Sequence, residues 1–258
     1  MPFTISHAAA VLPFSRPLAR WHLLSATVIG SMVPDFHLFL PWHLERFETH
    51  SVVALFTFCL PVGLACYWLF EWHIKVAAVE LLPDAAYRRW RALERPAEFS
   101  SLKAWGLGAF GVLLGAFTHL TWDAFTHENA RGVRMLPLPD EPVFRVGHHF
   151  VYLPRLLQDI SSLVGLIVVI AILAWGLRPD GKGPAERHLK PRERRLWFRA
   201  ALLTALAAVA AAAYLTEQPY PWHNAGAVIY NLAIDTLRGL MVAALLVPIP
   251  VRLRLHRP

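Results

Sequence analysis

Long apolar runs constrain this chain more than any other feature. Residues 51–70, 102–123, 160–177 and 198–215 each approach the roughly 18–25 apolar residues that a helix needs to cross a bilayer, and residues 225–251 are long enough to cross with a tilt. The chain has 258 residues, of which 56% are hydrophobic and only 17% charged, too apolar for a water-soluble domain of this length. The sequence therefore predicts an all-α integral membrane protein, a helical bundle with about five transmembrane helices.

The first fifty residues form a separate problem. Residues 5–12 and 18–33 are apolar, but Pro13, Pro17 and Pro34 interrupt them. We expect a re-entrant or interfacial helical hairpin here, which would return Asp35 to the same level as His7. If residues 18–40 crossed the bilayer instead, His7 would lie on the opposite side. The start of the chain lacks the basic residues that open a cleavable signal peptide, so we expect it to be retained.

Basic residues predict the orientation. They are concentrated in residues 71–103, in residues 178–199 and in the tail after residue 251, so these segments should be cytoplasmic and the first fifty residues non-cytoplasmic. Contacts with anionic lipid then account for the net charge of +7 without a nucleic-acid partner. We expect residues 1–177 to form one helical membrane domain, and residues 178–258 to add a basic cytoplasmic loop and a two-helix hairpin. Two cysteines, Cys59 and Cys66, fall inside the first span and indicate packing rather than a disulfide or a zinc site.

Histidines and carboxylates gather at the predicted outer ends of the helices. In "GAFTHLTWDAFTHE", His119, Asp123 and His127 are spaced four residues apart and so share one helical face. Imidazole and carboxylate ligands on successive turns suit zinc, manganese or iron. The alternative is a polar helix end that packs under a loop.

Three further residues stand where apolar sequence meets polar sequence: His7, Asp35 and His50. Each has an ordinary structural interpretation, as a helix start, a helix end after Pro34, or an interfacial anchor. Together with His119 and Asp123 they would place five ligands at one membrane face. Polar groups there are costly unless they are paired, and a shared divalent metal, which we expect to be zinc, would satisfy all of them.

Five stretches in this order resemble an uncharacterised bacterial membrane family known as domain of unknown function 4184: "MPFTISHAAAVLPF", "ATVIGSMVPDFHLFLP", "THSVVALFTFCLPVGL", "GAFTHLTWDAFTH" and "LLQDISSLVGL". The looser pattern of an early His, Pro-Asp, Thr-His-Ser and His-x-x-x-Asp is similar to the YdjM-like membrane-bound metal-dependent hydrolases. That resemblance implies a metal site formed by His7, Asp35, His50, His119 and Asp123. The hydrolases usually carry His-Arg-Gly before Thr-His-Ser, whereas this chain has Arg46-Phe47-Glu48, so the role of this arginine stays open.

These patterns predict a metal-dependent hydrolase with its site at the outer membrane face, acting on a phospholipid or a lipid-linked phosphoester. We expect Asp35 to serve as ligand or general base and His127 as a catalytic acid, with His149 and Gln158 as weaker candidates. Two alternatives remain. A metal-binding or ion-translocating protein would place Asp235 and Arg238, three residues apart in the last span, on a polar path, and a purely structural membrane protein would bind no metal.

Overall fold

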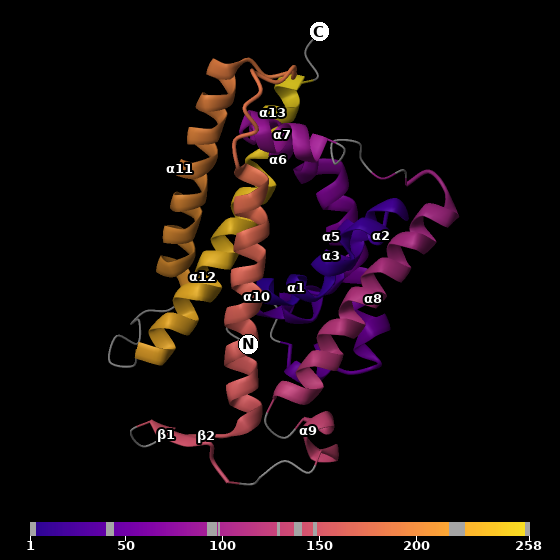
Figure 1. Ribbon diagram of the computed structural model, residues 1–258, viewed down its shortest axis with the longest axis vertical. Coiled ribbons are helices and arrows are strands. Elements are labelled where there is room, and N and C mark those ends of the chain that lie inside the picture. Colours follow the sequence, from indigo (N-terminus) through magenta and orange to yellow (C-terminus); the bar gives the residue numbers. More distant parts are fainter. Residues whose placement is uncertain are drawn as a thin grey trace. The chain divides into compact units, whose positions relative to one another are not determined.

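A computed structural model describes residues 4–39, 44–91, 97, 99–127, 130–136, 141–146, 149–216 and 225–255. The predicted outer loop 217–224 and the end of the basic tail lie outside this part of the chain. The described residues are almost entirely helical (Figure 1). Contacts between residues divide the chain into two compact units, the first formed by residues 1–37, 42–65 and 105–171 and the second by residues 38–41, 66–104 and 172–258.

Five helical stretches are long and apolar enough to cross a membrane, which confirms the predicted fold class. They are Leu55–Leu81, Leu102–Thr126, Leu153–Leu177, Pro191–Tyr214 and Asn231–Leu253. The first runs without a break through η4 (Leu55–Cys59), α5 (Leu60–Leu69), η5 (Phe70–Ile74) and α6 (Lys75–Leu81). The others correspond to α8 (Leu102–Thr126), α10 (Leu153–Leu177), α11 (Pro191–Thr216) and most of α12 (Ala225–Leu246) together with most of α13 (Pro248–Leu255).

The first span continues further than the sequence predicted. We expected a loop after residue 70, but the helix extends to Leu81. Glu71 and Lys75 lie one turn apart inside it, with Nζ of Lys75 2.5 Å from Oε2 of Glu71 and both side chains buried. Each charge therefore has an opposite charge beside it, and the pair can stay within the helix.

The N-terminal region of the first unit is a series of short helices. These are η1 (Thr4–His7), α1 (Ala8–Val11), η2 (Leu12–Phe14), α2 (Ser15–Arg20), α3 (Leu24–Gly30) and η3 (Val33–Leu38). His22 has a φ of 56°, a left-handed conformation that separates α2 from α3. The location of this region at the membrane interface stays a prediction. A short helix, α4 (Arg46–Thr49), follows η3, and Glu45 and Glu48 form a capping box at its start.

Close helix contacts fix α3 against α8. A Cβ added to Gly115 would lie 2.1 Å from the carbonyl oxygen of Thr27, and one added to Gly30 would lie 2.2 Å from that of Val112. The neighbouring side chains of Ala26 and Val112 are completely buried. Small residues here allow two helix backbones to approach, as they do in membrane helix pairs. Because Gly115 is one turn before His119, this contact also fixes the position of His119.

Beyond the C-terminal end of α8, the first unit continues through α9 (Arg131–Met135) to a two-stranded antiparallel hairpin. Its strands, β1 (Phe144–Val146) and β2 (His149–Val151), pair Phe144 with Val151 and lead directly into α10.

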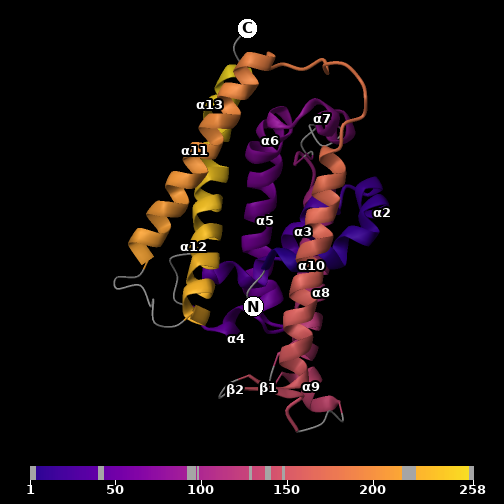
Figure 2. The same ribbon diagram turned by 60° about the vertical axis from the view of Figure 1, so that its left-hand side comes forward.

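The second unit contains α7 (Asp84–Trp90), α11, α12 and α13, with α11 and α12 side by side (Figures 1 and 2). Its basic segments contact one another: Arg88 binds Asp180 with distances of 2.5 and 2.7 Å, and Nη1 of Arg194 lies 2.5 Å from Oδ1 of Asp84. The two basic segments that the charge pattern assigned to one membrane side therefore pair within one unit.

We predict that Gly115→Ala destabilises the protein by about 1–3 kcal/mol or more, because the added methyl group meets backbone atoms that cannot move aside. Gly106→Ala in the same helix is the matched control, since a Cβ there has nothing within 4 Å. Thermal unfolding in detergent, followed by size-exclusion chromatography, compares the two variants with wild type. Equal melting temperatures for both variants would contradict the packing of α3 on α8.

Candidate metal centre

Five polar residues from four segments of the first unit meet at one point. His7 ends η1, Asp35 lies in η3 directly after Pro34, His50 follows α4, and His119 and Asp123 lie one turn apart on α8. His7, Asp35, His119 and Asp123 are buried, and the side chain of His50 is only 5% exposed. The structure thus brings together all five residues that the sequence predicted as ligands.

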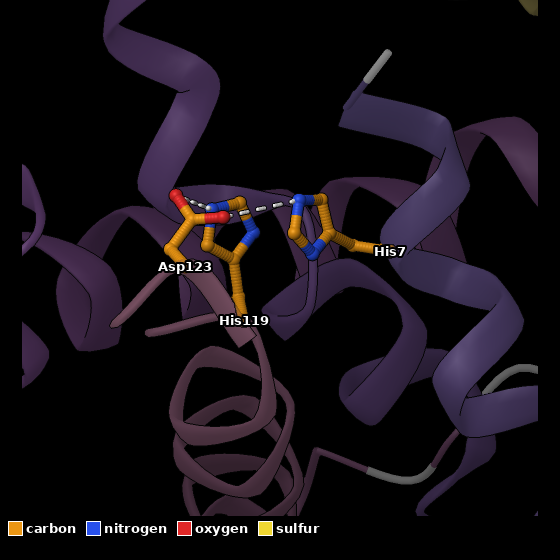
Figure 3. Close-up of side chains that lie close together, drawn as sticks. All are labelled: His7, His119 and Asp123. Atoms are coloured by element: carbon orange, nitrogen blue, oxygen red, sulfur yellow. Dashed lines mark ion pairs between the residues drawn. The ribbon is translucent and has the colours of Figure 1, made fainter. Parts of the chain in front are cut away.

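Asp123 lies at the centre of the cluster (Figure 3). Its Oδ1 is 3.8 Å from Nε2 of His7, and its Oδ2 is 3.5 Å from Nε2 of His119 and 3.6 Å from Nε2 of His50. Asp35 holds a similar place, with Oδ1 3.3 Å from Nε2 of His50 and 3.6 Å from Nε2 of His119. The imidazoles of His7 and His119 stack at 3.7 Å.

These separations are too long for good hydrogen bonds. Nε2 of His7, His50 and His119, Oδ1 of Asp123 and Oδ2 of Asp35 are buried and have no hydrogen-bond partner among the described residues. Leaving such an atom unsatisfied costs about 1–3 kcal/mol. Four ligands arranged tetrahedrally at 2.0–2.1 Å from a zinc ion lie about 3.4 Å from one another. The donor set and its spacing therefore fit a divalent metal ion better than they fit mutual hydrogen bonding.

Two subsets of the cluster have ligand atoms within 4.8 Å of one another: His7, His119 and Asp123 form one, and Asp35, His50 and His119 form the other. His119 belongs to both. Its Nε2 has one lone pair and can bind one ion, so a single ion near His119 would draw ligands from both subsets.

Contacts behind the ligands orient the imidazoles. Nδ1 of His119 donates to the carbonyl oxygen of Ser31 at 2.8 Å, so its Nε2 carries the lone pair that faces the cluster. Oγ1 of Thr49 donates to the carbonyl oxygen of Arg46 and lies 2.8 Å from Nδ1 of His50. An acceptor at Nδ1 of each ring is the arrangement that holds metal-binding histidines in place.

Burial favours the metal-binding protonation state of two imidazoles, those of His7 and His50. Burial lowers the pKa of His7 to about 3 and also lowers the pKa of His50, so both imidazoles are neutral at pH 7. Burial by itself raises the pKa of Asp35, but the imidazoles of His119 and His50 outweigh it, and the pKa of this carboxyl lies below its usual range. Neutral imidazole and ionised carboxylate are the forms that bind metals.

Two residues extend the centre beyond the predicted ligands. Nη2 of Arg46 donates to Oδ2 of Asp123 at 2.6 Å. Arg46, whose role was open from the sequence, therefore contacts one of the predicted ligands. His127 lies just after α8, with Nδ1 3.6 Å from Oδ2 of Asp123 and Nε2 3.2 Å from Nε2 of Gln158. Burial lowers the pKa of His127 to about 4. Gln158 therefore reaches the site through His127, and the side chain of His149 lies outside the described part of the chain.

A cavity of about 550 Å³ opens beside the cluster. His50, Asp123 and His127 line it, together with Arg46 and two arginines of α9, Arg131 and Arg134. Asp35 is not among the residues that line this cavity, and its role as ligand or general base stays a prediction. No local sequence pattern predicted that the two α9 arginines reach this cavity, because the path of an irregular segment cannot be inferred from residue spacing.

The chain belongs to the family described as Domain of unknown function (DUF4184), which it matches over residues 1–249. The match covers nearly the whole chain and extends well beyond residue 177, where the recognised stretches ended. No curated protein and no solved structure matches the chain. The similarity to the YdjM-like hydrolases therefore stays a prediction.

We predict that purified wild-type protein carries about one or two equivalents of zinc, manganese or iron, and that Asp35→Ala and His119→Ala lose them. Thr49→Val should weaken the metal affinity about 10–100-fold, because it removes the group behind His50. Inductively coupled plasma mass spectrometry on detergent-purified protein measures the content.

His22→Asn is the matched control, since His22 is exposed and Asn tolerates its left-handed backbone conformation. Size-exclusion chromatography establishes that each variant is folded. A wild-type protein that contains no metal and takes up none when it is added would contradict the metal centre.

Proposed function

We propose that this protein is a membrane-embedded, metal-dependent hydrolase that acts on a phospholipid or a lipid-linked phosphoester. The observation that carries the proposal is the set of five buried ligand atoms without hydrogen-bond partners, directly beside an open cavity. A site that only stabilised the fold would have no need of the cavity. Zinc, with manganese or iron as alternatives, suits the imidazole and carboxylate ligands.

A bound divalent metal would polarise a phosphoryl oxygen and lower the pKa of a water molecule. Hydrolysis joins the oxygen of water to phosphorus, breaks the bond to the ester oxygen, and moves a proton from water to the departing alcohol. His127 is the residue we assign to this proton transfer, because it lines the cavity and its Nδ1 has no described hydrogen-bond partner. Gln158 positions its ring from the opposite nitrogen.

A second cavity, of about 510 Å³, supports a lipid as substrate. It reaches His7 and lies between the start of the chain, α8 and α10. Phe117, Val164 and Val168 from the membrane-spanning helices line it. The charged lining of the cavity beside His127 and the apolar lining of the cavity beside His7 match the two parts of an amphiphile.

We predict that metal-loaded protein in lipid nanodiscs releases phosphate or a phosphorylated headgroup from at least one short-chain phospholipid or lipid phosphate. His127→Gln should lower kcat about 10²–10⁴-fold while metal content stays at the wild-type value, because it removes a proton-transfer group and no ligand. A coupled assay for phosphate or liberated headgroup measures turnover, and a chelator should abolish it.

Asp159→Asn is the control for this measurement, since Asp159 is exposed and pairs with Arg155 at the outer end of α10. Metal-loaded wild type without turnover on any lipid phosphoester, or turnover that His119→Ala leaves unchanged, would overturn the hydrolase proposal.

We further infer that the protein lies in a bacterial inner (plasma) membrane, with the C-terminus cytoplasmic and the metal centre facing the non-cytoplasmic side. The charge distribution supports this orientation. We predict that a membrane-impermeant maleimide labels Glu141→Cys in intact cells, and labels Lys182→Cys only after lysis. Both positions are exposed, whereas the natural Cys59 is buried. The reverse labelling pattern would place the centre on the cytoplasmic side.

A further inference from the structure

The cavity beside the metal centre has a strongly basic lining. Arg46, Arg131 and Arg134 line it, and Asp123 is its one described carboxylate. Arg46 already binds Asp123 at 2.6 Å. Among the residues that the structure describes, no carboxylate pairs with Arg131 or Arg134. Two positive charges therefore face this cavity without a described counter-charge.

The position of the two arginines is fixed by the fold. They are three residues apart on α9, which places them on the same side of this short helix. Gly132, between them, is buried against the end of α8: a Cβ there would lie 2.6 Å from the carbonyl oxygen of Ala124 and 2.9 Å from the ring of Phe125. Figure 1 shows α9 next to this end of α8. The close contact fixes the backbone of α9, and both arginine side chains line the same cavity as Asp123 and His127.

We propose that Arg131 and Arg134 form an anion-binding subsite that receives the phosphoryl group of the substrate, with Arg46 as a bridge between this subsite and the metal centre. The proposal rests on the proposed function for its substrate class. Guanidinium groups bind phosphate oxygens through paired, charge-assisted hydrogen bonds, which makes arginine the usual residue for this task. Within the cavity, the phosphate oxygens would lie between the α9 arginines on one side and the ligand atoms of His50 and Asp123 on the other.

A lipid headgroup and a free phosphate share this chemistry. Exposed apolar side chains follow the arginines directly, with Met135 81% and Leu136 43% exposed. Such residues beside positive charges are typical of a surface that meets the headgroup and acyl boundary of a membrane.

Isothermal titration calorimetry on the full-length protein in a non-ionic detergent tests the subsite. The two probes are inorganic phosphate and dihexanoyl phosphatidic acid, with dihexanoyl phosphatidylcholine as the reference lipid. We expect Arg131→Gln/Arg134→Gln to weaken binding of at least one anionic probe about tenfold or more, since each lost charge-assisted bond is worth roughly that factor. Metal content should stay at the wild-type value, because neither arginine contacts a ligand.

Arg16→Gln/Arg20→Gln is the matched control, since both residues are exposed on α2 and the change in charge is the same. Selective weakening for phosphatidic acid would identify the lipid headgroup as the natural source, and equal weakening for both probes would identify the phosphate group alone. Wild type that binds neither probe, or a double variant that binds as tightly as the control, would overturn the subsite. Asp35→Asn separates the test of the subsite from the test of the hydrolase proposal. If this variant loses the metal but still binds phosphate, the subsite is intact although the protein has lost its catalytic metal.

Discussion

The first unit depends on one constraint: three imidazoles and two carboxylates are buried together at distances where they do not hydrogen-bond to one another. Nε2 of His119 and Oδ1 of Asp35 are 3.6 Å apart, and Nε2 of His7 and Oδ1 of Asp123 are 3.8 Å apart. Without a common partner each unsatisfied atom opposes folding. A cation bound among them would convert this cost into a favourable interaction, and its binding free energy would then contribute to the stability of the folded state.

Small residues bring the ligand-bearing segments close enough for this. At Gly115 the backbones of α8 and α3 touch, and this contact sets Ser31 opposite His119. The absence of a side chain at Gly165 likewise allows α10 to approach Ser6, whose hydroxyl donates to the carbonyl oxygen of Ser162 at 2.7 Å. His7 follows Ser6 directly in the chain. The ligands therefore come from helix ends and short turns, while the rigid parts of the membrane helices determine how near those ends can come.

The sequence predicted the membrane helices and the five clustered residues because both depend on local signals. Apolar length identifies a span, and His119 and Asp123 share a helix face by spacing alone. The C-terminal end of the first span was predicted too early, since the pairing of Glu71 with Lys75 is a contact that makes two charges compatible with a helix interior. The contact of Arg46 with Asp123 joins residues that are far apart in the chain, and the arginines of α9 reach the cavity through a buried glycine contact. Neither of these two contacts produces a local sequence pattern from which it could have been predicted.

The last span bears on the choice between hydrolysis and ion translocation. Nη1 of Arg238 lies 3.4 Å from Oδ1 of Asp235, and Nη2 donates to the carbonyl oxygen of Leu38 at 3.0 Å. A guanidinium group held by a carboxylate and a backbone carbonyl within one unit locks two segments together. A translocation path requires polar groups that exchange partners as an ion passes. Within the second unit, a fixed pair of this kind joins α12 to Leu38 and gives no support to a translocation path. The candidate metal centre lies in the first unit. There the unsatisfied atoms adjoin open space, which is the condition that a substrate requires.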